Sequence, residues 1–290
     1  MFNVTSDVQR SWSTQLRAVA ERVALALPPV VEEVVLTGSV SRGVADHLSD
    51  VEMLLVTAVP LNLSQCFEHA RSAGLVDLDT WGRQGTEVSR VFGYYERIPV
   101  ETIWWPSDFA EDSVDAVIAG EPSMAADALV NGVALRTVGL LEAWQARLGD
   151  YPDALAAARI EEAAAAWGGF HATGFLTLAR PRERLALVEY LCNDAARVLQ
   201  IVYAMNRVWQ PTTKRLADRV ASLAVKPSRL AERIEDALTE PDPLRAMLMM
   251  SELQVDTADL APTGPNVERA RRWLRDVVAV LREAIDSRAT

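Results

Sequence analysis

The chain has 290 residues, of which 50% are hydrophobic and 24% charged, a composition that excludes a disordered or fibrous protein and is large enough for two domains. Its formal net charge of −11 argues against a nucleic-acid binder, because such proteins present basic surfaces to phosphates, and favours neutral or cationic partners. The two cysteines, Cys66 and Cys192, lie far apart and outside any zinc or redox motif, so neither a disulfide framework nor a zinc site is expected.

The first hundred residues combine helical and strand patterns. Apolar residues recur at helical spacing over residues 8–27, and the pair Pro28-Pro29 ends this pattern. Two short β-rich runs, joined by a glycine-serine turn and a helical start, follow over residues 33–37 and 50–57. A helix is expected over residues 63–73, and two strands over residues 86–95 and 98–105.

After residue 107 the pattern changes to long helical periods rich in alanine, leucine and arginine, which prolines interrupt. We predict about six helices in this part of the chain. The expected fold class is therefore α+β, with a mixed β-sheet domain flanked by helices over residues 1–110 and a helical bundle domain over residues 111–290. No basic segment precedes an apolar stretch at the N-terminus and no long apolar run occurs, so we expect a cytoplasmic protein that does not enter the membrane.

The turn at Gly38-Ser39 is the first candidate for chemistry. A glycine-serine pair that leaves a strand and starts a helix offers backbone N–H groups and a hydroxyl, which suit a phosphate. The alternative interpretation is a strand-to-helix connection with a serine cap.

Three acidic residues form the second candidate. Asp50 and Glu52 lie two positions apart on an expected strand, so both carboxylates point to one face, and like charges so close together call for a cation such as Mg²⁺. A third acid, Glu101, lies inside another apolar strand, and three acids on neighbouring strands near a phosphate turn predict metal-assisted phosphoryl or nucleotidyl transfer. The alternative is a set of surface acids on solvent-facing strands.

The run G-S-x-x-R-G, followed by S-D-x-E and by an isolated acid within an apolar strand, resembles the DNA polymerase β-like nucleotidyltransferase superfamily. The helical second half resembles the aminoglycoside nucleotidyltransferases. The resemblance implies that Gly38 and Ser39 contact the triphosphate and that Asp50 and Glu52 bind Mg²⁺. It also implies that Glu101 is a third metal ligand or the general base. Glu52 departs from the commoner Asp at its position.

Residues 206–214 are similar to an N-x-x-[YW]-x-P-x-x-K segment of related bacterial transferases, which implies that Lys214 reaches the nucleotide phosphates. The chain has 27 arginines and only two lysines, so a lysine here suits a site that needs a compact ammonium group, although a chance match is the alternative. Arg42 is either a further phosphate ligand or an exposed arginine of a helical first turn.

Five further residues have weaker functional interpretations. One ring of the pair Trp104-Trp105 is a candidate for stacking on a base or sugar, with the core as the alternative. His47 is expected to be a solvated loop residue. Glu189 and Asp194 would either attract a cationic acceptor or belong to a charged, solvated helix face.

We therefore expect an enzyme that transfers a nucleoside monophosphate, AMP by preference, from Mg²⁺–NTP to a hydroxyl of a small molecule and releases pyrophosphate. The resemblance implies ATP as donor, an aminoglycoside as acceptor and a role in antibiotic resistance, and the negative charge is compatible with a cationic acceptor. The alternatives are a protein- or RNA-modifying nucleotidyltransferase of the toxin–antitoxin type and a non-catalytic nucleotide sensor. A polymerase that extends nucleic acid is disfavoured, and a homodimer is one of several open oligomeric states.

Overall fold

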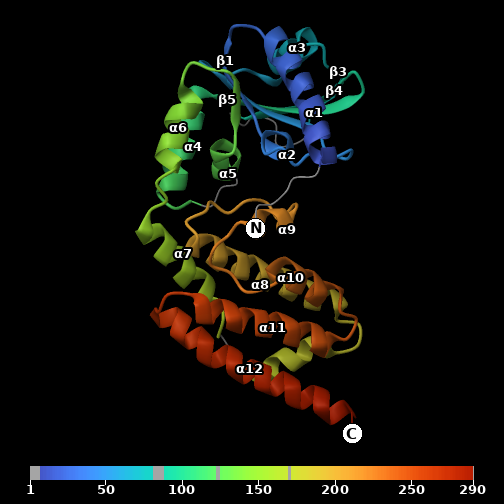
Figure 1. Cartoon of the computed structure of the whole chain (residues 1–290), viewed down its shortest axis with the longest axis vertical. Coiled ribbons are helices and arrows are strands. Elements are labelled where there is room, and N and C mark those ends of the chain that lie inside the picture. The colour runs from blue at the N-terminus through green and yellow to red at the C-terminus, as the bar shows by residue number, and fades with distance from the viewer. Residues whose placement is uncertain (1–6, 81–87, 122–124, 169–170, 290) are drawn as a thin grey trace. The chain divides into compact units, whose positions relative to one another are not determined.

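The computed structural model describes residues 7–80, 88–121, 125–168 and 171–289, and the chain divides into two compact units. The first unit spans Val4–Asp150 and the second spans Tyr151–Thr290 (Figure 1). As predicted, the fold class is α+β, with a mixed sheet in the first unit and helices in the second.

The first unit is built on a six-stranded sheet with the strand order β3-β4-β5-β2-β1-β6. Strands β2 and β5 at its centre are parallel, and the other neighbouring strands pair antiparallel. The strands are β1 (Val31–Leu36), β2 (Val51–Thr57), β3 (Val76–Asp79), β4 (Ser89–Tyr95), β5 (Ile98–Pro106) and β6 (Val133–Arg136). Residues 86 and 87 of the strand expected over 86–95 lie outside the described residues.

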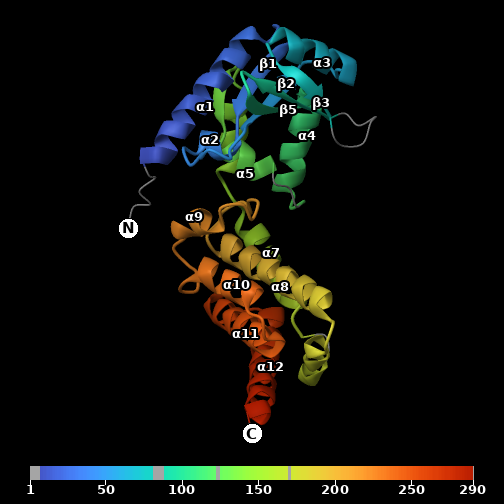
Figure 2. The ribbon, with the colours of Figure 1, turned by 90° about the vertical axis from the view of Figure 1, so that its right-hand side faces the viewer.

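One face of the sheet is covered by α1 (Asp7–Ala26) and α3 (Leu63–Ser72), as Figure 2 shows from the side. Because strand side chains alternate, Met53, Leu55 and Trp104 all point to this face and are buried in its core. Trp104 is 2% exposed and its indole N–H donates to Thr102 Oγ1, so it is a core residue rather than a stacking partner.

The opposite face is covered in part by helices from residues 107–148. Leu54 and Val56 of β2 are buried there, where α4 contacts β2 and β5, and α6 contacts β1. Glu33 of β1 is fully buried, and its carboxylate accepts hydrogen bonds from the backbone N–H groups of Val138 and Leu141 at the start of α6. The helices are α4 (Ser107–Ile118), α5 (Ala125–Val130) and α6 (Leu140–Leu148).

The boundary between the units differs from the expected division after residue 110. Strand β6 pairs with β1, and the guanidinium of Arg136 donates to four backbone carbonyls around the end of α1, including those of Ala24 and Val31. These bonds, with the packing of α4 and α6, hold residues 111–150 in the sheet unit. The sheet unit therefore ends at Asp150.

The second unit is helical, and its helices pack on one apolar core that includes Leu191, Ile201, Met247 and Leu274. Prolines lie at the start of α7, α11 and α12, and Asp242 caps the helix that begins at Pro243 by accepting from the N–H groups of Leu244 and Arg245. The helices are α7 (Asp153–Ala165), η1 (Ala172–Ala179, a 3₁₀ helix), α8 (Arg184–Met205), α9 (Leu216–Ala221), α10 (Leu230–Thr239), α11 (Pro243–Leu260) and α12 (Pro265–Ala289).

Asp194 of α8 is not part of a solvated helix face. It is 1% exposed, it pairs with Arg197 at 2.8 Å, and burial raises the pKa of its carboxyl above the ordinary value. Glu189, five residues earlier, is exposed. The two acids therefore do not form a common surface.

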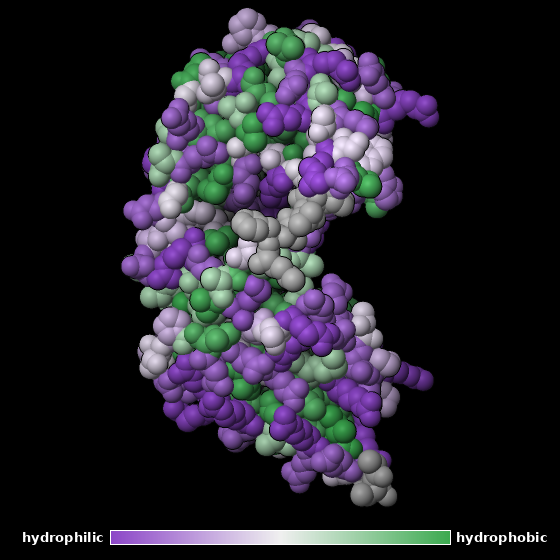
Figure 3. Space-filling view, in the orientation of Figure 1, coloured by the Kyte–Doolittle hydropathy of each residue, from purple (hydrophilic) through white to green (hydrophobic). Residues whose placement is uncertain are grey.

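Hydrophilic side chains cover most of the face drawn in Figure 3, in keeping with the charged fraction of the sequence. Among the helices of the described residues, none combines the length and the apolar character that crossing a membrane requires.

Candidate active site

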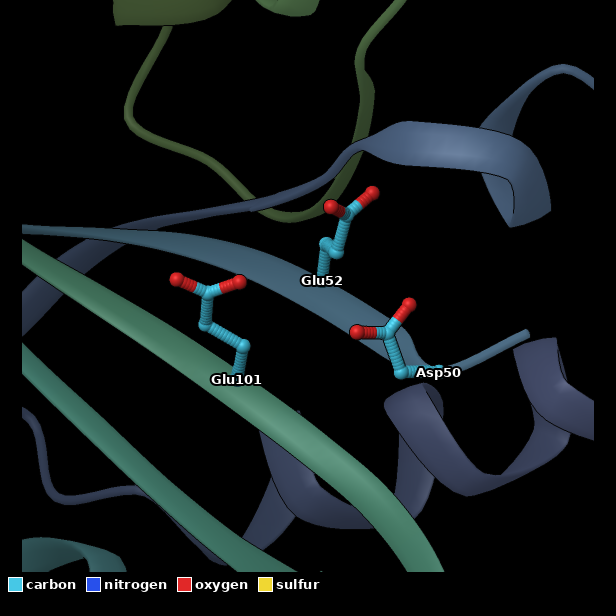
Figure 4. A group of neighbouring side chains, drawn as sticks. All are labelled: Asp50, Glu52 and Glu101. Atoms are coloured by element: carbon cyan, nitrogen blue, oxygen red, sulfur yellow. The ribbon is translucent and has the colours of Figure 1, made fainter. Parts of the chain in front are cut away.

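Three carboxylates meet at one end of the two central parallel strands (Figure 4). Glu52 of β2 and Glu101 of β5 are directly paired in the strand register, and Asp50 immediately precedes β2. One oxygen from each of the three side chains lies within 4.8 Å of the others, and all three residues are half-buried. The structure therefore brings together the three acids that the sequence singled out.

The parallel pairing explains why the acids are so close. Residues that are paired in register on neighbouring strands, such as Glu52 and Glu101, point their side chains to the same face of the sheet. A residue two positions earlier, such as Asp50, points to that face as well. Val51 and Met53, which alternate with the acids on β2, are fully buried on the opposite face. The sheet thus separates a carboxylate face from an apolar face at this position.

The electrostatics of this cluster favour a bound cation. Two unit charges at about this separation repel each other by roughly 3 kcal/mol at a half-buried protein site. Carboxylate oxygens are the hard ligands that Mg²⁺ prefers, and Mg²⁺ is typically held by a few carboxylates together with substrate phosphates. Asp50, Glu52 and Glu101 therefore fit a divalent cation.

The glycine-serine turn lies directly against this cluster. The backbone N–H of Thr37 donates to the carbonyl of Glu52 at 2.9 Å, and α2 (Gly38–Ser41) begins at the next residue. Gly38 has a φ of +71°, and a Cβ atom there would lie 1.5 Å from Oε2 of Glu52. The backbone conformation therefore favours glycine at this position, and a larger residue would also have to displace the end of the Glu52 side chain.

The loop before Asp50 is fixed by its own hydrogen bonds. The Ser49 hydroxyl donates to the Asp46 carboxylate at 3.1 Å and accepts from the Asp46 N–H at 3.0 Å, while the Leu48 N–H donates to the same carboxylate. This turn sets the direction in which the chain enters β2. Ser49 thereby helps to orient Asp50, and His47 at the tip of the turn is exposed as expected.

Ser39 and Arg42 belong to the same turn. Ser39 is half-buried, and its carbonyl accepts from the Val44 N–H at 3.0 Å. Arg42 caps the C-terminal end of α2 and forms an ion pair with Asp127 of α5, with 3.7 Å between Nη1 and Oδ2. Asp127 could not be identified from the sequence. It lies in a short apolar segment, and nothing there indicates an ion pair with Arg42, 85 positions earlier.

Trp105 occupies the carboxylate face of β5, four residues after Glu101. It is half-buried, and its ring packs edge-on against Phe109 with 5.3 Å between the centroids. Of the two adjacent tryptophans, this one shares a face with the acids.

Lys214 belongs to the second unit, where it lies exposed in the turn before α9. Its carbonyl accepts from Arg219 Nε at 3.0 Å. The other lysine, Lys226, has a structural role, because its ammonium donates to the carbonyls of Ala221 and Leu223 at the end of α9.

The sequence matches no family model, and no curated protein matches it. The fold is similar to that of a nucleotidyltransferase-like protein from Exiguobacterium sibiricum, with 10% sequence identity and a TM-score of 0.40. The similarity covers 93% of this chain and 80% of that chain. At this level of similarity the activity has to be inferred from the geometry of the carboxylates and the turn beside them.

Proposed function

We propose that this chain is a metal-dependent nucleotidyltransferase that uses Mg²⁺–NTP, with ATP as the expected donor. The proposal rests on one observation: one oxygen from each of three carboxylates, at the end of two parallel strands, lies within 4.8 Å of the others, and a glycine turn is in contact with one of the three, Glu52. Acids that could hold a cation therefore lie beside backbone suited to a polyphosphate.

In this reaction the oxygen of an acceptor hydroxyl attacks the α-phosphorus of the nucleotide. A new bond forms between that oxygen and the α-phosphorus, and the bond from the α-phosphorus to the oxygen that bridges to the β-phosphate breaks. Pyrophosphate leaves with the electron pair of the broken bond. The proton of the hydroxyl passes to a carboxylate oxygen of Glu101, which acts as general base.

The other residues bind and orient the donor. Asp50 and Glu52 would hold Mg²⁺, which neutralises charge that develops on the phosphates. Gly38 and Ser39 would contact the β- and γ-phosphates through their backbone N–H groups and the Ser39 hydroxyl. Lys214 is proposed as a further phosphate ligand, and the support for this role is only the similarity of its sequence segment to that of related transferases.

The acceptor that we propose is a small molecule with a hydroxyl group, and an aminoglycoside is the first candidate. The net charge of −11 supports a cationic acceptor. Confirmed transfer to an aminoglycoside would also support a role in antibiotic resistance.

The proposal is tested by incubating the protein with Mg²⁺ and α-labelled ATP, in the presence of either a panel of aminoglycosides or a cell lysate. We expect label on a small molecule, and its loss when Mg²⁺ is chelated. Label on protein or RNA would replace the small-molecule acceptor with a macromolecule. Nucleotide binding without Mg²⁺ and without transfer of any of the four nucleotides would favour a sensor.

Three variants test the assigned roles. Asp50→Asn and Glu101→Gln should each reduce turnover by at least about 100-fold while the protein remains folded, because each removes one charge from the cluster. Glu68→Gln is the matched control, since Glu68 is an exposed carboxylate on α3, which covers the other face of the sheet. Full activity in Asp50→Asn or Glu101→Gln would contradict the roles proposed for them.

A further inference from the structure

Asp127 of α5 contacts the phosphate turn from a part of the chain that sequence patterns assign to helices. Its carboxylate pairs with Arg42, and both side chains are largely buried, with 20% of Arg42 and 11% of Asp127 exposed. Figures 1 and 2 both show α5 beside α2. An ion pair in such an environment is screened less by solvent than one at the surface.

Asp127 is itself held in place. The side-chain amide of Asn131 donates to Oδ1 of Asp127 at 2.9 Å and to its backbone carbonyl at 2.9 Å. The backbone N–H of Asn131 also donates to that carbonyl, at 3.1 Å. One carboxylate oxygen is therefore fixed by Asn131, and the other faces Arg42.

The backbone of Arg42 lies near the glycine turn, because only the short helix α2 separates them. It is the residue after α2, whose first residue, Gly38, touches Glu52. At about 1.5 Å per helical residue, the backbone of Arg42 starts roughly 6 Å from Gly38. A guanidinium is a planar fork of five N–H donors, so one edge can face a carboxylate while another faces a phosphate.

From this chain of contacts, Asn131 to Asp127 to Arg42, we propose that Asp127 is a positioning residue for nucleotide binding. It orients the guanidinium of Arg42 toward the β- and γ-phosphates of the nucleotide held at Gly38. This role rests on the proposed function, because it requires a nucleotide at the turn. Asp127 does not touch the reacting atoms.

The test compares Asp127→Ala and Asp127→Glu with the wild-type protein, in kinetics of nucleotide transfer and in thermal stability. Asp127→Ala should raise the KM for ATP about tenfold, the effect of weakening one charge-assisted hydrogen bond, and leave kcat within about twofold. Asp127→Glu, which keeps the charge, should recover part of the loss. A merely structural role would lower the melting temperature and leave the KM unchanged.

A double variant tests whether Asp127 acts through Arg42. Asp127→Ala should have no further effect on KM in an Arg42→Ala background, since the group that it orients is gone. Additive effects would overturn the proposal. Glu111→Gln is the matched control, because Glu111 also pairs with an arginine, Arg147, and accepts an N–H bond from Trp144. It should leave KM and kcat unchanged.

Calorimetric titration with Mg²⁺–ATP separates this role from the proposed function. A wild-type protein that binds nucleotide but transfers none would overturn the transferase assignment alone. Equal affinity of the wild-type protein and Asp127→Ala would overturn the positioning role. A wild-type protein that binds no nucleotide would overturn both.

Discussion

At the scale of single residues, Glu52 and Gly38 constrain each other. The carboxylate of Glu52 occupies the space that a side chain at position 38 would fill, and Gly38 adopts a φ of +71° in contact with it. The longer side chain of glutamate, where aspartate is commoner in the superfamily that the sequence resembles, places this carboxylate against the turn. The carboxylate cluster and the glycine turn are therefore in direct contact.

Substitution of Gly38 should be costly for two separable reasons. Gly38→Ala should lower the free energy of unfolding by about 1–3 kcal/mol, from left-handed strain of about 1 kcal/mol and from displacement of the end of the Glu52 side chain. Gly43→Ala is the control for strain alone, because Gly43 has a φ of +73° and a Cβ there would meet nothing within 4 Å among the described residues. Urea denaturation of both variants measures the difference.

A second substitution, at Glu52, tests whether contact with Glu52 causes part of the stability loss in Gly38→Ala. In the Gly38→Ala background, Glu52→Asp should recover part of the lost stability, because the shorter side chain withdraws its carboxylate from the turn. Equal stability of Gly38→Ala and Gly43→Ala would show that Glu52 moves aside at little cost.

The two thiols should differ sharply in reactivity. Cys66 is fully buried, and burial raises the pKa of its thiol from 9.0 to about 11, whereas Cys192 is exposed. A chromogenic disulfide reagent at pH 8 should therefore titrate one thiol in the native protein and two in urea. Two fast-reacting thiols in the native protein would contradict this burial.

Because the folded state disfavours the Cys66 thiolate, the contribution of Cys66 to stability should fall as the pH rises from 9 toward 11.

At the scale of elements, one buried and one half-buried carboxylate bind helix starts that lie far along the chain. Glu33 of β1 accepts hydrogen bonds from the start of α6, and Glu161 of α7 accepts from the N–H groups of Asn266 and Val267 at the start of α12. A negative charge at a helix N-terminus is favourable, because the helix dipole and the unpaired N–H groups point toward it. Each unit thus uses one acid to fix a helix that follows about a hundred residues later.

Glu33 should therefore matter for stability more than an ordinary strand residue. Glu33→Ala should lower the free energy of unfolding by about 2–4 kcal/mol, since it leaves buried N–H groups without their acceptor, and Glu33→Gln should cost about half as much because one oxygen remains. Glu32→Gln, on the same strand, is the control. Denaturant unfolding of the three variants checks this order. A Glu33→Ala protein as stable as the Glu32→Gln protein would contradict it.

The elements that the sequence predicted well are those with a long or clearly alternating pattern. The helix over residues 8–27 and the strands around Asp50 and Glu101 were found within a few residues of their observed limits. Strand β6 was missed, because its four residues are too few to show alternation and its partner β1 lies about a hundred positions earlier. The acids of the site could be identified from residue type and spacing, whereas the Arg42–Asp127 pair depends on packing that the spacing does not encode.

At the scale of the whole molecule, the sheet unit extends to Asp150 because its second face is covered by α4 and α6. A fragment of residues 1–150 should unfold cooperatively, as a domain with its own core. A fragment of residues 1–110 should not, because it lacks β6 and α6, exposes Leu54 and Val56, and leaves Glu33 without its donors. Thermal unfolding followed by circular dichroism compares the two. A cooperative transition in the shorter fragment would place the domain boundary earlier.

The uneven use of lysine has a practical consequence for labelling. Only two lysines are present, and the ammonium of Lys226 is engaged at the end of α9 while Lys214 is exposed. An acylating reagent used sparingly at mildly alkaline pH should therefore modify Lys214 and the terminal amine in preference to Lys226. A fluorophore can thus be attached to the segment proposed to bind nucleotide without introducing a cysteine, and protection of Lys214 from acylation by Mg²⁺–ATP would report directly on its occupancy.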